Sequence, residues 1–151
     1  MAEIFPDEGL DYLLGVAFKA TTVDTTLFMG LFTSQTATTA PARSATGGAS
    51  PSGWTEMTAS SGSYARIAVA TGDWGAAATN GNGRRISLSA AKHFTDFVGA
   101  AAANGFILAT NSASGAGDTM VYFSNFDSGV ARTMASVSDQ LNITARAQFD
   151  G

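Results

Sequence analysis

The sequence predicts a mainly β protein, an antiparallel β-sandwich of the jelly-roll kind, with one N-terminal α-helix. Three observations support this fold class. A single segment has helical periodicity, several short segments alternate apolar and polar residues, and Gly/Asn pairs separate those short segments. Short strands broken by such turns are typical of sandwiches and barrels rather than of βαβ folds. We expect residues 1–151 to form one domain.

The predicted helix spans about residues 6–18. Its apolar residues recur at the i, i+3, i+4, i+7 and i+8 positions, and they are Leu10, Leu13, Leu14, Ala17 and Phe18. Pro6 suits the first turn because it lacks an N–H donor, and the acidic residues that follow suit the positive end of the helix dipole. We interpret the segment as a core-packing helix, with an arm docked on a neighbouring subunit as the alternative.

The next segment changes period. Residues 25–33 read TTLFMGLFT, which predicts a strand that is apolar on both faces and therefore covered on both sides. Residues 34–53 are small and polar, with Arg43 as the one charge, and they predict a long loop. Such loops are functional, disordered or ordered against a partner chain.

From Trp54 onward the pattern is all β. A strand is expected near residues 63–70, and Asn80-Gly81 with Asn82-Gly83 predicts a turn. Residues 81–85 have the glycine spacing of a phosphate loop, but they lead into a strand rather than a helix, so we interpret them as a hairpin turn.

The C-terminal half continues this alternation of strands and turns. Ala100–Ala103 is expected to form a tight loop or one helical turn, and Asn104-Gly105 is expected to be a turn before the next strand. Another strand is expected at residues 120–123. After a turn at Ser138-Asp139, the alternation over residues 141–149 predicts the last strand.

Composition excludes several classes of protein. The chain has 8 basic and 12 acidic residues, for a net charge of -4, which argues against a nucleic-acid binder. It has no cysteine for a disulfide or thiolate site, and no apolar run long enough to span a membrane. Only 13% of residues are charged and 28 are alanine, so the surface is nearly neutral and large core residues are few.

No catalytic constellation is visible in the sequence. The single histidine, His93, adjoins Phe94 and is interpreted as a surface or half-buried packing residue. No G-x-S-x-G elbow is present, and the carboxylates are scattered. We therefore expect no enzymatic activity, no cofactor and no metal site.

The aromatic residues are better candidates for function. Trp54 and Trp74 are interpreted as core anchors, with an interface contact or a carbohydrate platform as alternatives. The candidate assembly contacts are Phe5, Tyr12, Arg43, Trp54 and Trp74.

The order of motifs resembles a known family. The helix is followed by a strand at residues 27–32, then by Gly62-Ser63-Tyr64-Ala65-Arg66, by Trp74 with an Asn-rich turn, and by Ser138-Asp139-x-Leu141-x-Ile143. This order resembles the small structural proteins of tailed bacteriophages, described as decoration, head-fibre or tail-fibre-like proteins. The G-x-Y-A-R segment is its most specific element, and the long loop is larger than the pattern usually has.

The resemblance implies a β-sandwich virion component without enzymatic activity. We expect a capsid decoration or cement protein on the outer surface of the virion, in contact with the major capsid protein or another virion protein. We also expect a homo-oligomer, with a trimer favoured, and no contact with nucleic acid or membrane. A tail, baseplate or fibre component is the alternative, and a carbohydrate-binding module that uses Trp54 or Trp74 is a more remote one.

Overall fold

The computed structural model describes residues 3–4, 7–19, 24–35, 54–58, 64–81, 83–97, 101–113, 118–126 and 130–150. Within these residues the chain forms one α-helix, α1 (Asp7–Phe18), a short 3-10 turn at Thr71–Asp73, and thirteen β-strands. All strand pairings among them are antiparallel. The predicted fold class, mainly β and antiparallel with one N-terminal helix, is confirmed, whereas the packing of a sandwich stays a prediction.

The largest sheet has six strands in the order β1-β10-β9-β2-β3, and β4 pairs with β2 on the same edge as β3. β2 is its longest strand and pairs with three others. The strands are β1 (Glu3–Ile4), β2 (Thr26–Gln35), β3 (Trp54–Glu56), β4 (Ile67–Ala70), β9 (Gly105–Ala109) and β10 (Met120–Asn125).

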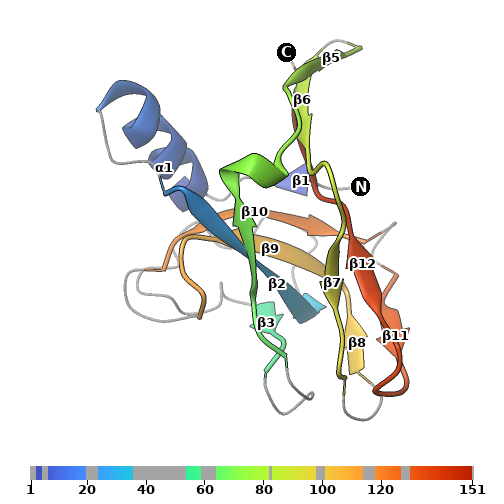
Figure 1. Ribbon diagram of the computed structural model, residues 1–151. Helices are drawn as coiled ribbons and strands as arrows, with labels where there is room; N and C mark the ends of the chain where they lie inside the picture. The colour runs from blue at the N-terminus through green and yellow to red at the C-terminus, as the bar shows by residue number, and fades with distance from the viewer. Residues whose placement is uncertain are drawn as a thin grey trace.

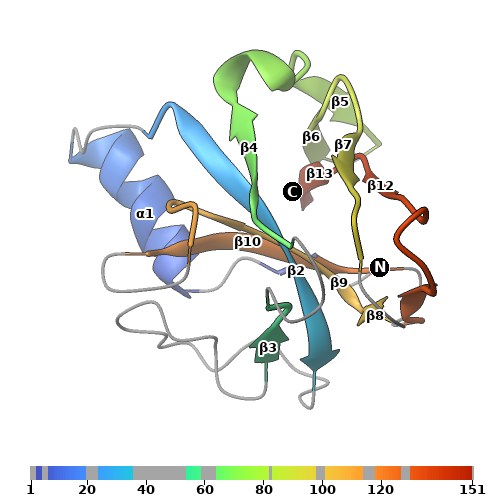
Figure 2. The same cartoon turned by 60° about the horizontal axis from the view of Figure 1, so that its bottom comes forward.

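Three smaller sheets complete the described structure. β13 (Arg146–Asp150), β6 (Gly83–Ser87) and β5 (Ala78–Asn80) form one sheet, in that order. β12 (Leu141–Ile143) pairs with β7 (Lys92–Phe94), and β11 (Arg132–Met134) pairs with β8 (Ala101–Ala103). Figures 1 and 2 show α1 beside one end of the six-stranded sheet and these smaller sheets beside the other end.

The core has two parts that lie on opposite faces of the large sheet, because successive residues of a strand point to opposite sides. The main cluster joins that sheet to the smaller ones, and its buried members include Met29, Leu31, Val69, Leu88, Phe94, Leu108, Tyr122, Met134 and Ile143. The second cluster consists of Phe32, Ile107 and Phe123. β2 contributes to both clusters, so the prediction of a strand buried on both faces is confirmed.

Local turn signals also predict the structure correctly. Asn80 pairs with Gly83 across the β5–β6 hairpin, and Gly81 has a φ of +56° that glycine adopts without strain. The loop predicted over residues 34–53 is wrong for its first two residues, because Ser34 and Gln35 belong to β2. The rest of that loop lies outside the described residues.

Three predictions about the strands are wrong. Ala101–Ala103 is neither a tight loop nor a helical turn but strand β8, whose alternate alanines are buried because they fit closely against the core. The single strand predicted over residues 141–149 is two strands, β12 and β13, which pair with different partners. The strand predicted near residues 63–70 begins only at Ile67.

Asn104-Gly105 is a junction between sheets rather than a hairpin turn. β8 pairs with β11, whereas β9 begins at Gly105 and pairs with β2 and β10. Asn104 fixes this passage because its backbone N–H donates to the Phe32 carbonyl at 2.8 Å and its Nδ2 donates to the Thr33 carbonyl at 3.0 Å.

The bounds of the helix are predicted to within one residue. The prediction of which face packs on the core is wrong. Leu10 is 37% exposed, Leu14 54% and Phe18 82%. The helix instead approaches β10 through Gly9, where an added Cβ would collide with the backbone of Val121. Half-buried residues follow at helical spacing, and they are Tyr12, Leu13, Gly15 and Val16.

Replacement of Gly9 by alanine tests which helix face is buried. Replacing an exposed glycine within a helix by alanine normally stabilises the helix by about 1 kcal/mol. Because Gly9 abuts Val121, we expect Gly9→Ala instead to lower the free energy of unfolding by about 1–3 kcal/mol in urea denaturation. Gly72→Ala is the control, since an added Cβ there meets no atom within 4 Å. A stabilised Gly9→Ala protein would contradict this packing.

Candidate functional site

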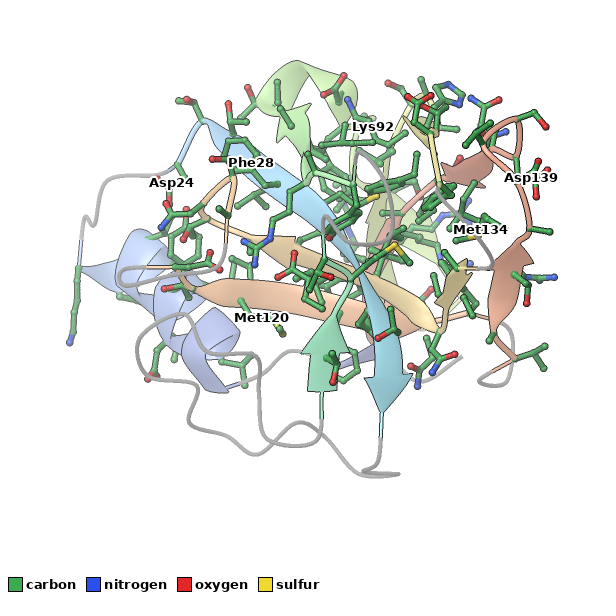
Figure 3. All side chains as sticks on the ribbon, turned by 90° about the horizontal axis from the view of Figure 1, so that it is seen from below. Asp24, Phe28, Lys92, Met120, Met134 and Asp139 are labelled. Atoms are coloured by element: carbon green, nitrogen blue, oxygen red, sulfur yellow. The ribbon has the colours of Figure 1, made fainter. Side chains whose placement is uncertain are left out.

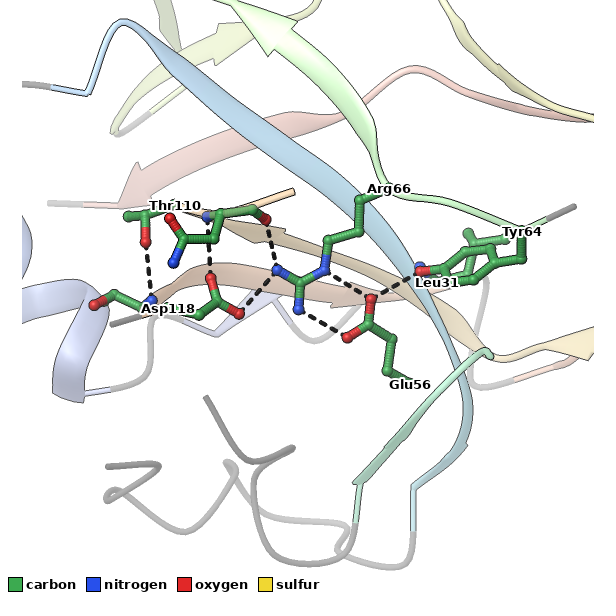
Figure 4. Close-up of polar contacts among 8 residues, drawn as sticks. Leu31, Glu56, Tyr64, Arg66, Thr110 and Asp118 are labelled. Carbon is green, nitrogen blue, oxygen red and sulfur yellow. Dashed lines mark hydrogen bonds and ion pairs between the residues drawn. The ribbon is translucent and has the colours of Figure 1, made fainter. Parts of the chain in front are cut away.

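A buried ionic cluster lies at the centre of the large sheet, built around the Arg66 side chain just before β4. This side chain is 3% exposed, and its partners Glu56 and Asp118 are 14% and 7% exposed. Arg66 Nε and Nη2 each donate to one carboxylate oxygen of Glu56 at 2.7 Å. This two-pronged pairing matches the planar geometry of both groups (Figure 4).

The remaining donors of Arg66 reach the β9–β10 connection. Nη1 donates to Asp118 Oδ2 at 2.8 Å and to the Asn111 carbonyl at 2.7 Å. Asp118 Oδ1 in turn accepts the Asn111 N–H at 3.1 Å. Arg66 therefore ties β3 and the start of β4 to Asn111 and Asp118, which lie between β9 and β10.

Tyr64 completes the cluster at the edge of β2. Its hydroxyl accepts the Leu31 N–H at 2.8 Å and donates to Glu56 Oε1 at 2.9 Å. Gly30 leaves room for this contact, since a Cβ there would lie 2.8 Å from the Tyr64 hydroxyl. The hydroxyl thus satisfies a backbone donor between the part of β2 that pairs with β4 and the part that pairs with β3.

The surroundings raise the pKa of two groups of the cluster, Tyr64 and Arg66. Burial, together with the negative charge of Glu56, raises the pKa of Tyr64 far above its usual range, so the phenol stays a neutral donor. Burial alone would lower the pKa of Arg66, but hydrogen bonds and charges from Glu56 and Asp118 outweigh it and raise that pKa. Tyr64 therefore acts as a neutral hydrogen-bond donor and Arg66 as a fixed cation that holds the two carboxylates.

The sequence points to Tyr64 and Arg66 as a motif but misses their partners. Glu56 and Asp118 lie 10 and 52 residues from Arg66, and nothing in the linear pattern links them. Composition offers the one signal that could have pointed to Glu56 and Asp118. Only 13% of the residues are charged, so a single charged residue beside an apolar strand is unusual in this chain.

The most accessible candidate for binding is an apolar stripe along α1, which we define as Leu10, Leu14 and Phe18. These residues follow one another at intervals of four, so they lie along one side of the helix. They are three of the five large apolar residues that are exposed in the described part of the chain. A contiguous exposed apolar surface of this kind is typical of an interaction site.

The predicted assembly contacts have different outcomes. Phe5 and Arg43 lie outside the described residues, and for Trp54 only the backbone, in β3, is described. Tyr12 is half-buried on α1, its hydroxyl accepts the Asp24 N–H at 2.9 Å, and burial raises its pKa. Trp74 is half-buried against the main core, which fits the anchor interpretation. The structure does not bring Tyr12 and Trp74 together, and their role in assembly stays a prediction.

Other sites considered from the sequence are also placed. His93 is an exposed residue of β7 whose Nδ1 lies 2.6 Å from Asn142 Oδ1, as expected for a surface residue. Within the described residues, no group of three His, Asp or Glu side chains is close enough to hold a metal ion. In the same part of the chain, no helix has the length and hydrophobicity needed to cross a bilayer.

Comparison of the chain with family models, with curated proteins and with solved structures finds no match.

Removal of the Arg66 charge tests the cluster. Arg66→Leu would leave Glu56 and Asp118 buried without their counter-ion, so we expect a loss of about 3–5 kcal/mol in the free energy of unfolding. Urea denaturation measures the difference. The control is Arg84→Leu, at an exposed site with one long contact to Thr79, which should change stability by less than about 0.5 kcal/mol. Equal effects of the two substitutions would contradict the assignment.

The turn between β11 and β12 gives stability a pH dependence. Asp139 lies at the edge of the molecule (Figure 3), where backbone N–H groups of Ala135 and Ser136 donate to its carboxylate and lower its pKa. A lowered pKa means that the stabilisation is present above about pH 4, the unfolded value, and is lost as the pH falls through the folded value. We expect Asp139→Asn to be less stable than the natural chain at pH 7, with a difference that shrinks in denaturation curves below about pH 4. A pH-independent difference would contradict the charge effect.

Proposed function

We propose that this chain is a non-enzymatic structural protein of a bacteriophage virion, namely a capsid decoration or cement protein that binds the outside of the head. The observation that carries the proposal is the apolar stripe of α1, whose Phe18 is 82% exposed. A helix that packs through Gly9 and presents leucine and phenylalanine outward is suited to docking on another protein. The motif order described above supports the phage assignment.

The energy of the stripe indicates what kind of partner suits it. Complete burial of three such side chains gains at most about 9 kcal/mol. Association costs about 4–15 kcal/mol in lost rigid-body freedom, so this contact alone roughly balances its own cost. A partner that offers several contacts at once overcomes this cost of association. Once the first contact holds the molecule in place, each further contact forms without a second loss of rigid-body freedom.

The weak charge of the chain fits the same proposal. A surface of alanine, serine, threonine and glycine can be covered by neighbours without desolvating many ions. Partners under this proposal are the major capsid protein or another virion protein, and further copies of the chain, with a trimer favoured. The net negative charge favours the exterior of the head over the surface that faces packaged DNA.

A tail, baseplate or fibre component is the alternative location. Imaging of virions at subunit resolution separates the two, since the head proposal requires density for this chain on the capsid in many copies. Density confined to the tail would overturn the head location and would keep the structural role.

Substitution within the stripe tests the docking surface. We expect Leu14→Glu to reduce the number of copies per virion at least tenfold, because a buried carboxylate at the interface would stay unpaired. Quantitative gel analysis of purified virions measures this number. Val137→Glu is the matched control, since Val137 is 61% exposed against 54% for Leu14 and lies between β11 and β12 rather than on the helix. Normal incorporation of folded Leu14→Glu protein would contradict docking through α1.

A further inference from the structure

The apolar stripe of α1 has the form of a ridge that fits a second helix. Its residues follow one another at intervals of four, and rows of this spacing are the ridges that interdigitate in the commonest class of helix pairing. A second row lies beside the stripe, one residue further along at each step, and consists of Asp11, Gly15 and Lys19. Because Gly15 has no side chain, the groove between the two rows is open beside Leu14.

The stripe and its surroundings face away from the fold. α1 approaches β10 through Gly9, and Figures 1 and 2 show the helix at one end of the large sheet. Besides the stripe itself, Asp11, Ala17 and Lys19 are exposed on this helix. The described part of the chain therefore leaves a helix face that combines apolar residues with a few charges open to another molecule.

Two charges of opposite sign flank the stripe on one side. Asp11 lies near the start of the second row and Lys19 at its end, where the Lys19 N–H continues the helical pattern by donating to the Gly15 carbonyl at 3.0 Å. Eight residues of helix separate the two side chains by about 12 Å, which is too far for them to pair with each other. Neither takes part in the ion pairs of the described residues. A partner with the opposite order of charges would pair with both.

A second copy of the chain supplies this order of charges when its helix runs antiparallel. In an antiparallel pair with a two-fold axis, a row on one flank of the contact faces the same row of the other helix. Asp11 of each copy then faces Lys19 of the other. With the axis at Leu14, the two levels differ by about 3 Å along the helix, which a lysine side chain spans. A parallel pair would instead place like charges at the same level, which is unfavourable.

The apolar residues match in the same antiparallel arrangement. Leu10 of one copy lies opposite Phe18 of the other, and the two Leu14 side chains meet at the axis. A smaller side chain therefore meets a larger one at both ends of the contact. Two stripes bury six exposed side chains for one loss of rigid-body freedom, which is twice the apolar gain of one stripe against a surface without apolar groups.

We propose that α1 pairs with the α1 of a second copy, antiparallel about a two-fold axis, with the stripes in contact and an Asp11–Lys19 ion pair on either side of the axis. This inference rests on the proposed function, because it names the occupant of the docking surface assigned there. Such pairs would link neighbouring copies on the head to one another. The end of each chain opposite α1 stays available for other contacts.

Sedimentation equilibrium of the full chain tests the pairing. We expect a monomer–dimer equilibrium between about 1 μM and 1 mM. Leu14→Glu should raise the dissociation constant at least about a hundredfold, because two carboxylates would meet at the axis. Val137→Glu is the control and should leave it unchanged, since Val137 is exposed elsewhere in the chain. A monomer at 1 mM, a trimer, or a dimer that Leu14→Glu does not weaken would overturn the proposal.

Exchange of the two charges tests the antiparallel arrangement. We expect Asp11→Lys and Lys19→Glu each to raise the dissociation constant about tenfold, because two attractive contacts become two repulsive ones. An equimolar mixture of the two variants should restore it to within about threefold of the natural chain, since both contacts of a mixed pair again join opposite charges. A folding defect cannot produce such a rescue. Arg84→Glu, at an exposed site on β6, is the control for the change of charge. No weakening, or no rescue in the mixture, would overturn the arrangement.

The outcomes separate this inference from the proposed function. A chain that stays monomeric, while Leu14→Glu is still lost from virions, would overturn the pairing and keep docking on the head through a different occupant of the stripe. A dimer that Leu14→Glu disrupts, together with normal incorporation of the same variant into virions, would keep the pairing and overturn docking through α1.

Discussion

The pairing of Arg66 with Glu56 and Asp118 is the interaction on which the large sheet depends. β2 shares one edge between two strands, β4 over residues 26–29 and β3 from residue 32 onward. At Leu31, where one partner ends and the other begins, the backbone N–H bonds Tyr64 and the carbonyl accepts Met57 N–H. The charge of Arg66 holds Glu56, and thereby Tyr64, at this point, so three segments distant in sequence meet in one arrangement.

Such a cluster contributes specificity more than net stability. The desolvation of buried ions offsets much of their attraction, so an apolar replacement of the whole cluster could be equally stable. A shift of β3 along β2 by one residue, however, would leave Glu56 and Arg66 buried without partners. Alanine-rich strands such as β8 have little side-chain shape with which to select a register, and we infer that the ionic cluster makes this selection for the centre of the sheet.

The parts of the fold that depend on local chemistry could be predicted, and the parts that depend on tertiary contact could not. The N-terminal acidic residues and the apolar periodicity place α1 to within one residue, and Asn80-Gly81 places a hairpin. The face that α1 buries is decided by Gly9, which contributes nothing to a hydrophobic pattern but allows the closest approach to β10. The division of the last strand into β12 and β13 follows from a change of pairing partner, which alternation along one segment cannot reveal.

The candidate sites also depend on tertiary contacts that the sequence pattern does not reveal. Aromatic residues were predicted as contact candidates. In the structure Trp74 packs on the core, and the Tyr12 hydroxyl accepts a hydrogen bond from the Asp24 backbone N–H. The surface that carries the proposed function is instead the apolar stripe of α1. Figures 1 and 2 place α1 and the β11–β12 region at opposite ends of the large sheet. A chain docked through α1 would therefore keep the β11–β12 region, with its exposed Val137, clear of that contact.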